Sequence, residues 1–128
     1  TEGDFGYKVK ISADGAVVAV GHNRATNGVL SDAGKVETFV LDGSTWISTG
    51  EFGGQAADSR FGTDLDINND GTVIAVGAPY YDDDKGYVEV YEWDGDSWEK
   101  RGSTLEGIES QNNSKDLKKK SLTLTHIL

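Results

Sequence analysis

The sequence contains no cysteine and no methionine, and only one of its 128 residues is proline. Without cysteine the fold can hold neither a disulfide framework nor a thiolate metal site, and cysteine usage leaves the compartment undetermined. No apolar run approaches the roughly 18 residues of a membrane-spanning helix, and no signal peptide is visible. The sequence therefore predicts no membrane span, and the targeting segment of a secreted parent protein would lie outside this sequence.

Basic residues are also scarce, because 12 lysines and arginines stand against 22 aspartates and glutamates, for a net charge of −10. The imbalance is uneven, with 5 basic and 8 acidic residues in 1–60, 3 and 12 in 61–107, and 4 and 2 in 108–128. A surface of this sign repels phosphate, which argues against nucleic acids and anionic lipids as partners. The acidic residues of 61–107 suit either cation binding or simple solubility.

Glycine, by contrast, is abundant, and several of the 17 glycines mark an internal repeat. The segment FGYKVKISADGAVVAVG (residues 5–21) aligns without a gap with FGTDLDINNDGTVIAVG (residues 61–77), 56 positions later. Downstream, GKVETFVLDGSTWISTG (residues 34–50) aligns with GYVEVYEWDGDSWEKRG (residues 86–102) at a spacing of 52. Repetition at this period predicts stacked or radially arranged units.

Each copy of the repeat has the pattern of four short β-strands. In the first copy, apolar and other residues alternate over 5–11, and an apolar run over 16–20 is typical of a buried strand. An Asp-Gly pair suited to a tight hairpin turn separates the two segments. No window has helical periodicity, so the sequence predicts an all-β fold. The remaining strands are expected at 36–41, around Trp46, at 61–67, 72–76 and 87–93, and around Trp98.

The residues that open and close each unit carry a family resemblance. Phe-Gly begins both copies, and Gly77-Ala78-Pro79 follows the second strand of the second copy, with an acidic loop between these landmarks. Residues 4–107 therefore resemble FG-GAP repeats, which are the blades of the integrin α-subunit β-propeller and of many microbial and algal surface proteins. The first copy departs from the pattern at Gly21-His22-Asn23, where the Ala-Pro pair is missing.

The resemblance implies two four-stranded antiparallel propeller blades, the first over residues 1–60 and the second over 61–107. Propellers close with about four to eight blades, so two blades form an incomplete ring, and we expect further blades or self-association. Residues 108–128 lack Gly, Trp and a hairpin turn, and we expect an irregular tail that is unrelated to the repeat or disordered. The residues expected to be buried are Phe5, Val9, Val18, Val20, Phe61, Leu65, Ile74 and Val76.

The acidic loop of the second copy is the candidate metal site. In integrin-type blades this loop binds calcium through an Asp-x-Asn/Asp-x-Asp-Gly pattern that is followed by a further Asp. The resemblance thus implies calcium ligands at Asp66, Asn68 and Asp70, with Gly71 at the turn. Calcium takes about six to eight oxygen ligands, some of them backbone carbonyls and waters.

Two features of the sequence favour an alternative to a calcium site, which is a plain Asp-Gly hairpin without a bound ion. The later Asp of the pattern is absent, since Val73 and Ile74 stand in its place. The first copy retains only Ser12 and Asp14 at the matched positions, although the same turn is expected there.

The other polar and aromatic clusters each have two interpretations. Asp82, Asp83 and Asp84 suit either a second cation site or a solvated loop. The aromatic residues suit either a sugar-stacking platform or the core between blades. His22 and His126 are isolated, so no catalytic triad or general base pair can be assembled. The aromatic residues in question are Trp46, Trp93, Trp98, Tyr80, Tyr81, Tyr87 and Tyr91.

The sequence predicts a non-enzymatic binding or adhesion module of an extracellular or cell-surface protein, with a protein or glycan ligand. Two alternatives stay open. One is a carbohydrate-binding propeller, and the other is the non-catalytic part of a propeller enzyme whose active centre lies on other blades, because fold alone does not set function.

Overall fold

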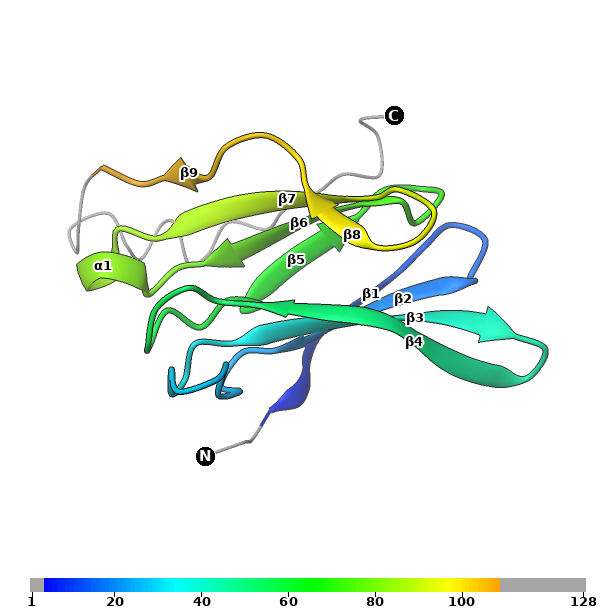
Figure 1. The fold of residues 1–128 in the computed structure, drawn as a ribbon, viewed down its shortest axis with the longest axis horizontal. Helices are drawn as coiled ribbons and strands as arrows, with labels where there is room; N and C mark the ends of the chain where they lie inside the picture. The colour runs from blue at the N-terminus through cyan, green and yellow to red at the C-terminus, as the bar shows by residue number, and fades with distance from the viewer. Residues whose placement is uncertain (1–3, 109–128) are drawn as a thin grey trace.

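The computed structural model describes residues 4–108 and shows an all-β fold of two stacked antiparallel sheets (Figure 1). Sheet 1 contains β1 (Phe5–Ile11), β2 (Val17–His22), β3 (Lys35–Asp42) and β4 (Thr45–Gly53). Sheet 2 contains β5 (Asp64–Ile67), β6 (Val73–Ala78), β7 (Tyr87–Trp93), β8 (Trp98–Lys100) and β9 (Leu105–Glu106). Helical structure in the described chain is limited to one turn, α1 (Tyr81–Asp84). Within residues 4–108, no helix has the length and apolar character needed to cross a membrane.

The two copies of the repeat take the same strand order and the same register. In each sheet the first four strands pair with their neighbours in chain order, as a series of hairpins. The pair Val9 and Val20 in sheet 1 corresponds to the pair Leu65 and Val76 in sheet 2. The tight turns after the first strands pass through glycines with positive φ, +76° at Gly15 and +78° at Gly71. The all-β prediction is confirmed.

The fourth strand differs between the two sheets. In sheet 1, β4 is continuous and pairs with β3 along its length, apart from one register shift. In sheet 2 the corresponding segment is divided into β8 and β9, and both pair with β7. Sheet 2 therefore has five strands where the sequence predicted four, because residues 101–104 interrupt the last one.

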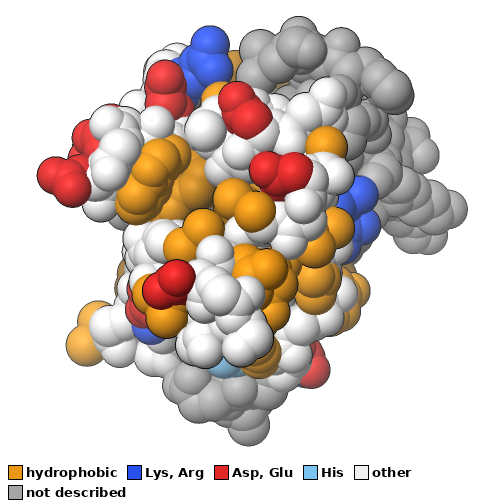
Figure 2. Space-filling model, turned by 90° about the vertical axis from the view of Figure 1, so that its right-hand side faces the viewer, with side chains coloured by type: hydrophobic (Ala, Val, Ile, Leu, Met, Phe, Trp, Pro, Cys, Tyr) orange, Lys and Arg blue, Asp and Glu red, His pale blue; other side chains and the backbone are white. Residues whose placement is uncertain are grey.

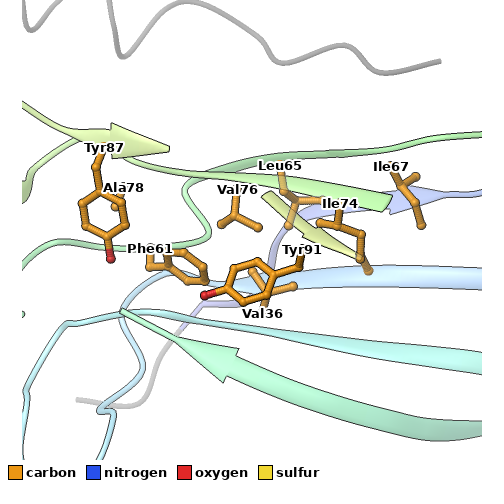
Figure 3. Close-up of a cluster of buried hydrophobic side chains, with 10 residues drawn as sticks. Val36, Phe61, Leu65, Ile67, Ile74, Val76, Ala78, Tyr87 and Tyr91 are labelled. Atoms are coloured by element: carbon orange, nitrogen blue, oxygen red, sulfur yellow. The ribbon is translucent and has the colours of Figure 1, made fainter. Parts of the chain in front are cut away.

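The core lies between the two sheets (Figure 3). Phe61 is fully buried, and its ring centroid lies 6.1 Å from that of Tyr87, 6.3 Å from that of Tyr91 and 6.2 Å from that of Phe52. The short turns β1–β2, β3–β4, β5–β6 and β7–β8 lie at one end of the sheets, which we call the turn end. Seen from this end, hydrophobic side chains gather at the seam between the sheets (Figure 2). The other buried residues of the core are Ala19, Val36, Leu65, Ile67, Ile74, Val76 and Ala78.

Burial was predicted correctly for sheet 2 and wrongly for part of sheet 1. Phe5 and Val9 are 57% and 52% exposed, and Val18 is half-buried. These residues lie on the face of sheet 1 that points away from sheet 2. Phe61 and Leu65, at the matched repeat positions, are fully buried because sheet 1 covers them. Val20, Ile74 and Val76 are buried as predicted.

Glycines allow the backbones of the two sheets to touch. A Cβ atom at Gly21 would lie 2.3 Å from the carbonyl oxygen of Gly62, and one at Gly34 would lie 2.0 Å from the carbonyl oxygen of Phe61. Gly62 itself has φ of +94°, a conformation that favours glycine. The Phe-Gly pair of the second copy is thus the joint between the sheets, because Phe61 fills the core and Gly62 permits the close approach. Of the expected tail, residues 109–128 lie outside the described residues, and Ile108 is exposed.

Candidate functional site

The predicted calcium ligands Asn68 and Asp70 belong to a hydrogen-bonded turn between β5 and β6. Asn68 is buried, and its Oδ1 accepts hydrogen bonds from the backbone N–H groups of Thr72 and Val73, both at 2.9 Å. Asp70 is exposed, and its Oδ1 accepts from the Thr72 hydroxyl at 2.5 Å and from the Thr72 N–H at 3.1 Å. These bonds from Thr72 lower the pKa of the Asp70 carboxyl below its usual value. Both side chains therefore stabilise the turn.

The first copy forms the same turn with a different residue. Ser12, at the position of Asn68, accepts from the Val17 N–H at 3.0 Å and donates to Asp14 Oδ1 at 2.8 Å. Asp14, at the position of Asp70, also accepts from the Ala16 N–H at 3.0 Å, and this bond lowers the pKa of its carboxyl. The structural role of these two positions is therefore common to both copies.

The third predicted ligand, Asp66, lies at the contact between the sheets. Its carboxylate is buried, and its Oδ1 lies 3.8 Å from the Nζ atom of Lys10 on β1. Two residues earlier, Asp64 Oδ1 lies 3.3 Å from Lys8 Nζ. Lys8 and Asp64 occupy matched repeat positions, as do Lys10 and Asp66, so the charge is inverted between the copies. An ammonium group from sheet 1 therefore accompanies each carboxylate of β5.

The three predicted calcium ligands have other partners within the chain. Within residues 4–108, no three His, Cys, Asp or Glu side chains gather as a metal site would require. The side-chain oxygens of Asn68 and Asp70 accept hydrogen bonds within the turn, and Asp66 has the ammonium group of Lys10 beside it. Calcium binding by these three residues stays a prediction.

Calcium titration tests that prediction directly. For an ion bound at Asp66, Asn68 and Asp70, we expect the melting temperature to rise with free calcium, because a ligand that binds the folded state stabilises it. Asp70→Ala should abolish the rise, whereas Asp14→Ala should keep it. Magnesium should substitute poorly, since it demands tighter octahedral geometry. Each aspartate also stabilises its turn, so the calcium-dependent rise in melting temperature is measured within each variant. If calcium does not raise the melting temperature of the unmodified chain, the loop is a plain hairpin.

Three connections meet at the opposite end of the sheets, and we call them the loop end. They are residues 23–34, 54–63 and 79–86, at the left of Figure 1. The Phe61 N–H donates to the Ala33 carbonyl at 2.8 Å, the Asn27 amide donates to the Gly54 carbonyl at 2.8 Å, and the Gln55 N–H donates to the Tyr87 hydroxyl at 3.3 Å. The loops are thus held to one another and to the core.

The loop end carries charges of both signs. The Arg60 guanidinium lies 4.7 Å from the centre of the Tyr80 ring, and Arg24 Nε lies 3.9 Å from Asp32 Oδ1. Asp82, Asp83 and Asp84 all have positive φ, so α1 is a left-handed turn, and Lys85 Nζ lies 3.5 Å from Asp82 Oδ2. The sequence pointed to the aspartates and Tyr80. It gave no signal for Arg24 or Arg60, whose positions depend on contacts between distant loops.

Of the seven aromatic residues considered for sugar stacking, Tyr87 and Tyr91 belong to the core, and Tyr81 and Trp98 pack against it. Phe52 stacks on Tyr91 with ring centroids 4.2 Å apart, and Trp98 Nε1 donates to Thr38 Oγ1 at 2.9 Å. Burial and the hydrogen bond to Glu89 raise the pKa of the Tyr91 hydroxyl. Trp46 remains exposed. The inter-sheet core interpretation therefore holds for Tyr87, Tyr91 and Trp98.

Comparison with known proteins gives no relative. No protein-family model matches the chain, and no curated protein is significantly similar to it. The FG-GAP resemblance therefore remains a proposal.

Proposed function

We propose that the chain is a pair of consecutive β-propeller blades of the FG-GAP type and that it acts as a non-enzymatic binding module of an extracellular or cell-surface protein. One observation carries the proposal: two sheets whose first three strands have the same register stack front to back. The face of sheet 2 that packs on sheet 1 matches, residue for residue, the face of sheet 1 that points away. This is how successive blades of a propeller are related, since each presents opposite faces to its two neighbours.

The loop end is the proposed binding surface. Recognition residues commonly lie on loops that a rigid scaffold positions. Backbone hydrogen bonds tie loop 23–34 to loop 54–63, and the contact of Arg60 with the Tyr80 ring joins loop 79–86 to them. Arg24, Arg60, Tyr80 and the acidic turn suit a polar protein partner, because arginine and tyrosine are favoured in protein interfaces. Carbohydrate binding is the alternative, and at the loop end it depends on an aromatic ring outside the core, that of Tyr80.

The test compares variants at the two ends of the sheets. The whole chain is immobilised and exposed to surface proteins of its source and, separately, to a glycan array. We expect specific protein retention to fall at least tenfold for the double variant Arg60→Ala/Tyr80→Ala. The matched control Ser97→Ala/Glu99→Ala removes an exposed hydrogen-bonded pair at the turn end and should bind normally. Retention that the loop-end variant leaves intact would overturn the proposal, and loop-dependent glycan retention would favour the alternative.

A further inference from the structure

The only Asn-Gly pair of the sequence, Asn27-Gly28, lies in a turn at the loop end. The Asn27 N–H donates to the Leu30 carbonyl at 2.9 Å, and the Leu30 N–H donates back to the Asn27 carbonyl at 3.0 Å. Gly28, the next residue in this turn, is exposed and has φ of +64°, and a Cβ atom there would meet no other atom within 4 Å. The turn is therefore closed by its own backbone and open to solvent at Gly28.

This pair combines the features that make an asparagine side chain chemically labile. The backbone nitrogen of the following residue can attack the side-chain carbonyl carbon, and glycine places no side chain in its way. In the part of the chain that the structure describes, the Gly28 N–H meets no hydrogen-bond acceptor, so its nitrogen is not engaged in the fold. The other described asparagines, Asn23, Asn68 and Asn69, are each followed by a residue with a side chain. Four Asp-Gly pairs form the same kind of ring more slowly, because an ionised carboxylate resists attack by a nucleophile.

We propose that Asn27 is a site of spontaneous deamidation that loosens the loop end as the protein ages. The Gly28 nitrogen bonds to Asn27 Cγ and gives up its proton, the Cγ–Nδ2 bond breaks, and ammonia leaves, which closes a succinimide ring. Water then adds to one of the two ring carbonyls. Opening on one side gives aspartate, and opening on the other gives isoaspartate, in which the backbone continues through the former side chain. The whole conversion consumes one water and releases one ammonia.

The amide that is lost connects loop 23–34 to loop 54–63. Asn27 Nδ2 donates to the Gly54 carbonyl oxygen at 2.8 Å, and the amide packs so closely on Gly53 that a Cβ atom there would lie 2.8 Å from Nδ2. This bond holds the amide in place, so the reaction requires local opening of the two loops. Either product replaces the donor with a carboxylate oxygen, which repels the Gly54 carbonyl oxygen at this distance. Deamidation should therefore separate the two loops.

Peptide mapping of the whole chain after incubation in warm, mildly alkaline buffer tests the site. Base favours the reaction because the attacking nitrogen must lose its proton. We expect conversion at Asn27 to exceed conversion at Asn69 at least tenfold, since Asn69 is exposed but precedes an aspartate. Gly28→Ala should slow the conversion of Asn27 at least tenfold, and the open space at that position leaves room for the added methyl group. An intact Asn27 under conditions that convert a synthetic peptide of residues 24–31 would overturn the proposal.

Asn27→Asp reproduces one of the two products and tests the structural consequence. The Gly54 N–H donates to the Gly34 carbonyl at 2.9 Å at the same junction, so its hydrogen exchange reports whether the loops separate. We expect this amide to exchange at least tenfold faster in Asn27→Asp than in the parent chain. Asn69→Asp is the matched control, because it adds the same charge at an exposed position of the turn end and should leave the Gly54 amide unchanged.

Equal protection of the Gly54 amide in the parent chain and both variants would overturn the loosening of the loop end. Both experiments are independent of what the loop end binds, so their failure would leave the proposed function intact.

Discussion

Replacing Phe61 with alanine is expected to lower the free energy of unfolding by about 3–5 kcal/mol, the usual cost of removing a large buried aromatic side chain. Phe61 is fully buried, and its ring meets Phe52 of sheet 1 as well as Tyr87 and Tyr91 of sheet 2. The truncation therefore leaves a cavity at the joint between the sheets. A loss of this size approaches the whole stability of a small domain, so the graded variant Phe61→Leu should be measured beside it.

The repeat provides the control for this experiment. Phe5 has the same place in the first copy but is 57% exposed, so Phe5→Ala should cost less than about 1 kcal/mol. Urea denaturation measures both values. Equal losses at the two positions would contradict the front-to-back stacking of the sheets.

The second large effect is expected at Asn68. Asn68→Ala leaves the buried backbone N–H group of Val73 without its acceptor, and it leaves the Thr72 N–H with Asp70 Oδ1 alone. An unsatisfied buried donor costs about 1–3 kcal/mol, so we expect the free energy of unfolding to fall by about that amount. Asn68→Asp should cost less, because the carboxylate can still accept both bonds. Urea denaturation gives the loss, and faster hydrogen exchange of the two amides locates it.

Ser12→Ala is the matched substitution in the first copy. Ser12 accepts one backbone hydrogen bond, from Val17, whereas Asn68 accepts two, so the loss should be smaller at Ser12. A neutral Asn68→Ala, or a Ser12→Ala that costs more, would contradict the role given to the two hydrogen bonds that Asn68 Oδ1 accepts.

The sequence was sufficient to predict the strands because each strand's signals are local. Apolar alternation and Asp-Gly pairs lie within a few residues of the structure they determine, and the repeat doubled the signal. Burial was different, since Phe5 and Phe61 have the same local pattern and opposite environments. What decides burial is the neighbouring sheet, which no local pattern encodes. The sequence also did not predict the interruption of the last strand at residues 101–104, because the residues up to Gly102 still match the first copy of the repeat.

The candidate site was predictable only in part for a related reason. The spacing of Asp66, Asn68 and Asp70 correctly placed them at the end of one strand and in the turn that follows. It could not show that Asn68 Oδ1 accepts two backbone hydrogen bonds or that Lys10 reaches Asp66 from the other copy. The repeat alignment does set Lys10 against Asp66, but that signal has meaning only once β1 and β5 are known to be neighbours.

The lysines of β1 and the aspartates of β5 also disfavour misassembly between two chains, in which like halves of the duplicated sequence would meet. Segments that match as closely as residues 5–21 and 61–77 can compete for one another's places, and repeat proteins commonly misassemble in this way. Two β1 strands brought together set ammonium beside ammonium, and two β5 strands set carboxylate beside carboxylate. The mixed pair alone brings opposite charges together, at 3.3 Å for Lys8 and Asp64. Misfolded competitors built from like halves therefore carry an electrostatic cost that the native order avoids.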